Sequence, residues 1–254
     1  MVTTVRDILS WLDGVAPPAL AEDWDNVGLL VGDPDGPVSR VLVSLDPSPA
    51  AVAQAAAMGA ELLVSHHPVI FGGQKRLLAG APAYELARAG IAAVAAHTNL
   101  DAADGGVNDA LAARLGLEEI RTAPDGLSRI GRLPQPLPPA AFVACVMDRL
   151  EAPAVQWRSG RRPVETVALC SGAGSDFMPS LLGAADAFVT GELKYHEWPD
   201  TAATVVAAGH YHTEIGIADA LAARLREAFP ALLVETAKES CPYATMVRRR
   251  GAAE

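Results

Sequence analysis

Apolar runs and helical segments alternate along most of the chain. In the first half, strands are predicted at 41–45, 61–65 and 91–95, and helices at 49–58, 83–89 and 106–115. A short amphipathic helix is expected at 2–12, and a turn leading into a short strand at 24–32. Strands and helices that alternate at this spacing predict a mostly parallel or mixed sheet covered by helices.

The second half of the chain repeats this plan. The segments 109–115 and 219–225 both read Asp-Ala-Leu-Ala-Ala-Arg-Leu, and a strand, a helix and a second strand precede each of them in the same order. Four elements in one order favour a duplication over the chance recurrence of an alanine-rich helix. The sequence therefore predicts two similar, intertwined α/β halves, residues 1–125 and 126–254, with no additional inserted domain.

The region between the two halves is rich in proline. Residues 132–139 read Arg-Leu-Pro-Gln-Pro-Leu-Pro-Pro, which is typical of a connector. A helix is expected from about 140 to 149. Two apolar runs, 155–157 and 164–167, flank the polar segment 158–162, and this pattern predicts a β-hairpin.

Metal-binding side chains gather where three apolar runs end. Five of the six histidines lie in these stretches, together with two carboxylates. The residues are His66 and His67, His97 and Asp101, and His210, His212 and Glu214. Imidazole and carboxylate are ligands of zinc, manganese and iron, and ligands of open α/β sheets lie beyond the carboxyl ends of the strands. We therefore predict a metal site at the strand ends, in the cleft between the halves.

The spacing of these residues restricts how they can bind. Neighbouring side chains of a strand point to opposite faces, so His66 and His67 can diverge toward two metals only where Pro68 ends the strand. One buried and one exposed structural histidine is the alternative. The pairs 97/101 and 210/214 are four residues apart, which places each pair on one face if a helical turn starts there; otherwise a loop must bring them together. Two cations about 3.5–4 Å apart lower the pKa of a bridging water.

Several polar residues near predicted strand ends keep more than one interpretation. Glu192 either orients substrate or acts as a base, or it is a solvated glutamate at a helix start; Asp46 is a similar case. His212 is a further ligand, a proton carrier or a surface histidine. The segment 72–75, Gly-Gly-Gln-Lys, lacks the spacing of a phosphate-binding loop.

Composition narrows the class of protein. The formal net charge of −10 argues against a dedicated nucleic-acid-binding protein. Three widely spaced cysteines indicate buried thiols in a reducing compartment. The N-terminus lacks the layout of a signal peptide, and no uncharged apolar run reaches the roughly 20 residues of a membrane span. A cytoplasmic location is predicted.

Five motifs in a fixed order connect the chain to a known family. They are Trp24-Asp25-Asn26-Val27-Gly28-Leu29, Ser65-His66-His67-Pro68, His97-Thr98-Asn99-Leu100-Asp101, Thr190-Gly191-Glu192 and Gly209-His210-x-x-x-Glu214. With them the chain resembles the type 2 GTP cyclohydrolase I homologues, also called Nif-three-like dinuclear metal-centre hexameric proteins. The resemblance implies a ring-shaped homohexamer with a dinuclear metal centre facing its interior.

The resemblance also assigns residues. By motif match the metal ligands would be His66, His67, Asp101, His210 and Glu214, and His97 would lie among or next to them. Many members carry an inserted domain that this chain lacks. Members often show paired histidines where only His196 occurs here.

Together these features predict a dinuclear metal-dependent hydrolase of a nucleotide-like or other small metabolite. GTP cyclohydrolase-type ring opening by metal-activated water is one version. His97 and Glu192 would shuttle protons, and two divalent ions (zinc, manganese or iron) would be the cofactors. The alternative is a hexameric metal-binding adaptor or scaffold without catalysis. Nucleic-acid association through a ring channel is a third hypothesis, which the acidic charge disfavours.

Overall fold

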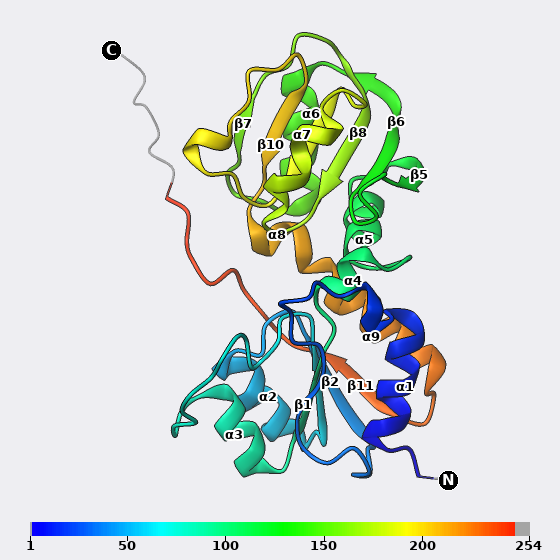
Figure 1. Cartoon of the computed structure of the whole chain (residues 1–254), viewed down its shortest axis with the longest axis vertical. Helices are drawn as coiled ribbons and strands as arrows, with labels where there is room; N and C mark the ends of the chain where they lie inside the picture. Colours follow the sequence, from blue (N-terminus) through cyan, green and yellow to red (C-terminus); the bar gives the residue numbers. More distant parts are fainter. Residues whose placement is uncertain (1, 247–254) are drawn as a thin grey trace. The chain divides into compact units, whose positions relative to one another are not determined.

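The computed structural model describes residues 2–246, which form two compact units (Figure 1). Among the described residues, the first unit extends to Ala110 and also takes Glu214–Glu239, whereas the second takes Leu111–Thr213 and residues 240–246. The chain thus passes from one unit to the other after residues 110, 213 and 239. This division differs from the single predicted boundary at residue 125, because the last helix and strand return to the first unit.

The first unit contains a five-stranded sheet. Its strands, in spatial order, are β1 (Gly28–Val31), β4 (Ala92–Ala95), β3 (Leu62–Ser65), β2 (Arg40–Ser44) and β11 (Leu233–Thr236). Its helices are α1 (Val5–Val15), η1 (Pro18–Leu20), α2 (Pro49–Met58), α3 (Pro82–Ala89), α4 (Thr98–Ala102) and α9 (Gly216–Ala228). Strand β1 is antiparallel to β4, and the other four strands are parallel to one another.

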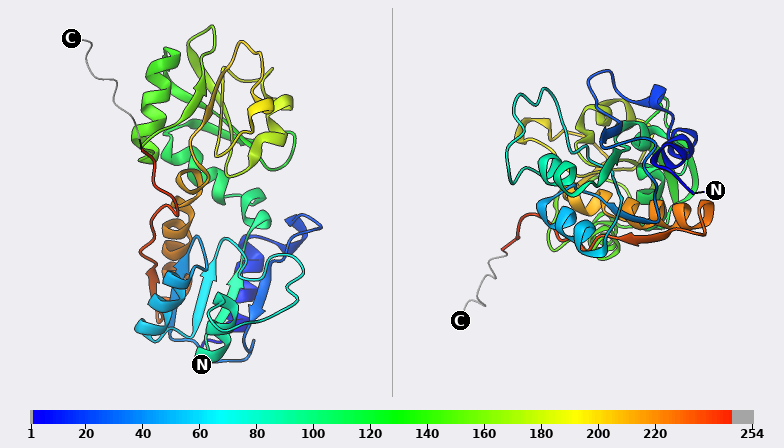
Figure 2. Two further views of the ribbon diagram at one scale, coloured as in Figure 1. Left: turned by 90° about the vertical axis from the view of Figure 1, so that its left-hand side faces the viewer. Right: turned by 90° about the horizontal axis from the view of Figure 1, so that it is seen from below.

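Helices cover both faces of this sheet. Figures 1 and 2 show α2 and α3 on one face and α1 and α9 on the other. Leu42 and Leu63 pack in one core cluster with Leu86 of α3. Because side chains alternate along a strand, Val41 and Val43 face the opposite way, and they are fully buried as well. A strand buried on both faces reads as a continuous apolar run, which is the pattern that predicted it.

Local signals set the ends of several helices. Thr4 and Asp7 form a capping box at the start of α1, and the side chain of Ser48 accepts a hydrogen bond from the first turn of α2. Gly59 and Gly90 end α2 and α3 in the left-handed conformation, with φ of 66° and 69°. These signals explain why the predicted bounds of α2 agree with the structure.

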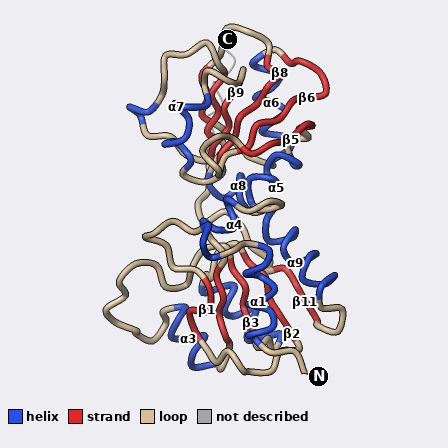
Figure 3. Tube along the Cα trace, turned by 45° about the vertical axis from the view of Figure 1, so that its right-hand side comes forward, coloured by secondary structure: helices blue, strands red, loops and turns tan. Residues whose placement is uncertain are grey.

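The second unit contains a six-stranded sheet. Its strands, in spatial order, are β5 (Glu118–Thr122), β6 (Arg129–Leu137), β8 (Val164–Cys170), β9 (Ala187–Thr190), β10 (Thr204–Ala207) and β7 (Gln156–Arg158). Its helices are α6 (Pro139–Leu150), η2 (Gly174–Phe177), α7 (Met178–Leu181) and η3 (Tyr195–Glu197). Helices α5 (Val107–Arg114) and α8 (His210–Glu214) lie where the chain passes between the units. Figure 3 shows the two sheets in red.

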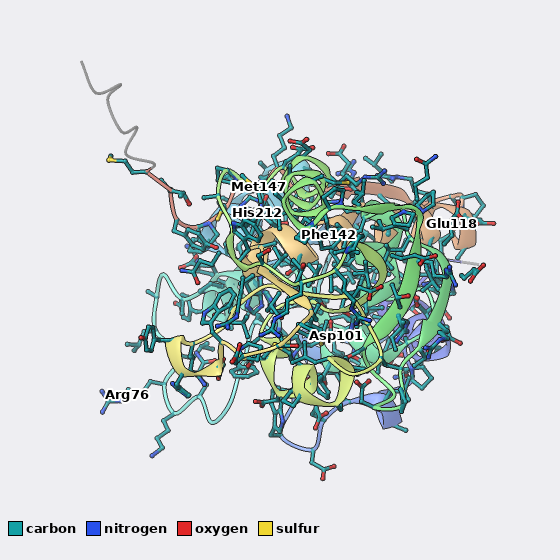
Figure 4. The ribbon with its side chains drawn as sticks, turned by 90° about the horizontal axis from the view of Figure 1, so that it is seen from above. Arg76, Asp101, Glu118, Phe142, Met147 and His212 are labelled. Atoms are coloured by element: carbon teal, nitrogen blue, oxygen red, sulfur yellow. The ribbon has the colours of Figure 1, made fainter. Side chains whose placement is uncertain are left out.

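This second sheet also has a core on each face. Phe142 of α6, whose side chain is labelled in Figure 4, is buried in one cluster with Val167 and Val189. Phe188, on the other face, packs in a second cluster with Met178 of α7. The chain therefore has the predicted fold class, α/β with mixed sheets covered by helices.

The predicted repeat is visible in the strand order. Strands β2, β3 and β4 are adjacent and parallel, and so are β8, β9 and β10. A short helix comes after the last strand of each set. Helix α4 starts directly after His97, and helix α8 starts at His210. Strand β11 nevertheless pairs with β2, whereas β5, from residues 118–122, belongs to the second sheet. The two halves are intertwined, as the sequence predicted.

Two predictions between the halves were wrong. The segment 155–167 is not a hairpin, because β7 pairs with β10 and both sides of β8 are taken by β6 and β9. The proline-rich stretch is largely strand β6 rather than a connector. Pro134 and Pro136 are tolerated because the last residue of β6 paired with β5 is Arg132, and the pairing with β8 shifts register beyond it.

No helix within residues 2–246 is long and apolar enough to cross a membrane.

Gly106 has a steric role in the turn after α4. A Cβ added there would overlap with the carbonyl oxygen of Leu100 and lie 2.9 Å from that of Ala103. We expect Gly106→Ala to lower the free energy of unfolding by about 2 kcal/mol or more, measured by urea denaturation. Gly14→Ala is the control, because a Cβ at Gly14 in α1 meets nothing within 4 Å. It should stabilise by up to about 1 kcal/mol, and equal effects of the two variants would contradict the steric role.

Candidate metal centre

Two adjacent strands bring the first four site residues together. Strands β3 and β4 are parallel with Ser65 opposite Ala95, so the residues that follow them leave the same edge of the sheet. His66 and His67 follow β3, and His97 precedes α4, which carries Asp101. Glu214, the last residue of α8, belongs to the same unit. The first unit thus assembles three histidines and two carboxylates.

Each of these histidines is held through its Nδ1 atom. The Nδ1 of His66 lies 2.9 Å from the carbonyl oxygen of Ala96, which can only accept, so this nitrogen carries the proton. The Nδ1 of His67 lies 2.7 Å from Asp46 Oδ1. The Nδ1 of His97 lies 2.9 Å from Asp25 Oδ1.

This pattern is typical of metal sites. A histidine that binds metal donates its other ring N–H to a carboxylate or carbonyl, which fixes the ring and its tautomer. In all three rings Nε2 is the remaining nitrogen. Donor atoms of His66, His67 and His97 lie within 4.8 Å of one another, as do those of His66, Asp101 and Glu214.

The distances from His66 Nε2 to the two carboxylates fit a shared cation rather than direct hydrogen bonds. His66 Nε2 lies 3.7 Å from Asp101 Oδ1 and 3.9 Å from Glu214 Oε2, whereas His67 Nε2 is 3.2 Å from Glu214 Oε2. Two atoms bound tetrahedrally to one zinc at its usual bond lengths are about 3.4 Å apart. His66 is 1% exposed, and its Nε2 has no hydrogen-bond partner among residues 2–246. A cation bound there would give this buried nitrogen a partner.

The electrostatics of His66 agree with this interpretation, whereas His67 would bind a cation only with loss of its Nε2 proton. Burial lowers the pKa of His66 to about 3, so its Nε2 keeps a lone pair at neutral pH. Burial also lowers the pKa of His67, but the hydrogen bonds and charges of Asp46 and Glu214 outweigh it and raise the pKa to about 10. Two carboxylates of low exposure lie here, and a divalent cation would neutralise their negative charge.

A fourth histidine has the same arrangement in the second unit. The Nδ1 of His210 lies 2.5 Å from Glu192 Oε1. Glu192 follows β9 and His210 follows β10, which are adjacent and parallel, so both residues leave one edge of that sheet. His210 and Glu214 begin and end α8, one helical turn apart, as their spacing predicted. The assignment of His210 as a metal ligand stays a prediction.

Two further histidines lie outside the metal-donor group of the first unit. His212 belongs to the second unit, and its backbone carbonyl oxygen accepts a hydrogen bond from Arg114 Nη1 at 3.1 Å. Burial lowers the pKa of its ring. His196 lies in the short helix η3 and is exposed.

Sequence reasoning missed one residue of the candidate site and left another open. Asp25 was noted only as part of a motif, but its carboxylate is buried and accepts hydrogen bonds from both His97 and Thr98. Burial raises the pKa of Asp25, yet the hydrogen bonds from Thr98 and His97 outweigh this and lower it. Asp46 was considered at a strand end without a partner, and the structure gives it His67. A carboxylate directly after a strand was the only signal for Asp46.

Residues 3–242 match the family described as Duf34/NIF3 (NGG1p interacting factor 3). The chain belongs to the Duf34/NIF3 family. A relative from Streptomyces coelicolor, named GTP cyclohydrolase 1 type 2 homolog, is 37% identical over 244 residues, which cover 88% of this chain and 86% of the relative. The Duf34/NIF3 assignment confirms the resemblance found in the motifs.

Solved structures agree with the Duf34/NIF3 assignment. The Staphylococcus aureus hypothetical protein SA1388 superposes with a TM-score of 0.90 at 26% identity, covering 97% of this chain and all of that one. TTHA1606 from Thermus thermophilus has a TM-score of 0.79 at 31% identity, covering 95% of this chain and all of that one. The fold described above is therefore shared with these proteins.

Proposed function

We propose that this Duf34/NIF3 protein is a metal-dependent hydrolase that binds two divalent cations and acts on a nucleotide-like or other small metabolite. GTP ring opening is one specific version, and the name of the Streptomyces coelicolor relative supports including it. The observation that carries the proposal is the set of three imidazoles, each held through Nδ1, beside two carboxylates of low exposure. Such a donor set suits zinc, manganese and iron.

In this proposal the metal ligands are His66, His67, Asp101, His210 and Glu214. When bound, two cations at such a site lower the pKa of water and stabilise negative charge on an oxygen. The chain's own contribution is orientation. Asp46 and the Ala96 carbonyl hold two of the imidazoles in place, and this support fixes the direction of their Nε2 atoms.

His97 and Glu192 are the proposed proton carriers. Asp25 fixes the tautomer of His97, so that Nε2 is the atom able to accept or release a proton on the substrate side. The side chain of Glu192 is 59% exposed, so it can exchange a proton with solvent and with a bound substrate, and it accepts the hydrogen bond from His210 Nδ1 that orients this ligand. General acid–base groups of this kind contribute about 10²–10⁴-fold to rate.

Assembly and location are further parts of this proposal. A ring-shaped homohexamer and a cytoplasmic location are proposed from the resemblance and from the composition, and a small-molecule substrate is proposed from the metal-donor set. Sedimentation of the metal-loaded protein tests the assembly without reference to activity.

The experiment that tests the function is turnover by metal-free protein reloaded separately with zinc, manganese and iron. The substrates are GTP, other nucleotides, cyclic nucleotides, phosphoesters and amides. We expect turnover of at least one nucleotide that depends on the metal and disappears on its removal. Equal turnover by metal-free protein would overturn the proposal. Silence across the panel with two metals bound per chain would instead support the adaptor function.

A further inference from the structure

Two exposed aromatic side chains stand beside the candidate metal centre. Trp24 and Phe71 are each 61% exposed. Their ring centroids lie 5.9 Å apart in an edge-to-face arrangement. Both rings also contact His97, with centroid distances of 6.3 Å for Trp24 and 6.0 Å for Phe71. A cluster of large apolar rings left in water marks a binding site more often than a single exposed side chain does.

The neighbours of these rings along the chain fix their positions. Asp25, directly after Trp24, is the carboxylate that holds His97. The side-chain amide of Asn26 donates to the carbonyl oxygen of Ile70 at 2.7 Å, and Phe71 follows Ile70. Residues 24–26 therefore act together. Trp24 supplies one ring, Asp25 orients His97, and Asn26 holds the segment that carries Phe71.

The geometry around His97 suits a flat ligand. In an edge-to-face pair one ring presents its edge, so its faces are free of the other ring, and aromatic faces bind planar rings by stacking. Charged side chains such as Lys75 and Arg76 belong to the same exposed loop, and Arg76 projects outward in Figure 4. The two aromatic rings, by contrast, contact the imidazole of the site.

We propose that Trp24 and Phe71 form a subsite that binds a planar aromatic ring of the substrate next to His97. This subsite selects ring-bearing metabolites over ring-free ones of the same charge. The inference rests on the proposed function, since the ring would belong to the molecule that is hydrolysed. Its test uses binding, so it can succeed or fail apart from turnover.

The experiment measures binding to the zinc-loaded full chain by calorimetry. The probes are guanosine monophosphate and ribose 5-phosphate, which share the sugar phosphate and differ by the ring. We expect Trp24→Ala and Phe71→Ala each to weaken guanosine monophosphate about tenfold, with no change for ribose 5-phosphate. Trp24→Phe should retain most of the affinity, because it keeps an aromatic face.

Leu78→Ala is the matched control, since Leu78 is 62% exposed in the same loop, and it should change neither affinity. Wild-type protein that binds both probes equally, or variants that bind guanosine monophosphate normally, would overturn the subsite. A change of assembly state in Trp24→Ala, seen by sedimentation, would also overturn it and identify a contact between copies of the chain. A silent substrate panel together with ring-dependent binding would overturn the proposed function alone.

Discussion

Glu214→Ala is expected to lose metal and turnover while keeping its fold. Glu214 is 4% exposed, and its Oε2 lies 3.2 Å from His67 Nε2 and 3.9 Å from His66 Nε2. The substitution removes a carboxylate that lies beside both imidazoles and would bind the metal together with them. We expect metal affinity to fall by about 100-fold or more. Metal per chain, measured after dialysis, and the circular dichroism spectrum check both parts of the expectation.

His97→Ala is the comparison that separates ligand from proton carrier. If His97 carries protons as proposed, this variant keeps its metal but loses about 100-fold or more in turnover. Loss of metal equal to that of Glu214→Ala would contradict this role and make His97 a ligand. A donor atom of His97 lies within 4.8 Å of those of His66 and His67, so position alone does not separate the two roles. The metal content of the variant does.

Metal binding should raise the thermal stability of the first unit strongly. A ligand that binds only the folded state at about 1,000 times its Kd adds about 4 kcal/mol. For a chain of this size we therefore expect the melting temperature to rise by about 10 °C on addition of zinc. In His66→Phe, which removes the buried Nε2 and keeps an aromatic ring, the rise should disappear. Calorimetric scans with and without zinc measure it.

Ser44→Ala is the control for this effect. Ser44 ends β2, next to the strand that leads to His66, and it is 1% exposed. Its hydroxyl oxygen is likewise a buried atom without a hydrogen-bond partner in the described part of the chain. Ser44→Ala should keep the full rise with zinc. Were it to abolish the rise, a general loss of polarity, rather than His66 as a ligand, would explain the result.

Much of the fold follows from local patterns. The parallel strands β2, β3 and β4 were predictable because strands buried on both faces read as continuous apolar runs. His66, His67 and His97 were predictable as candidate site residues because they closely follow those runs, and Asp101 because it stands four residues after His97. Strand β6 was not, because its prolines are tolerated only where it has passed the end of its neighbour β5. Strand β7 was assigned the wrong partner, since pairing partners depend on which strand edges are already occupied.

The sequence by itself determined the strand–helix order, the repeat and the residue types of the site, because periodicity and spacing act over a few residues. Only the tertiary structure decided how those residues are held. Asp25 reaches His97 across 72 positions and Asp46 reaches His67 across 21. The tertiary structure also brings Trp24 and Phe71 together, through the hydrogen bond from the Asn26 side chain to the Ile70 carbonyl oxygen. These contacts join separate segments, and no local pattern encodes which segments meet.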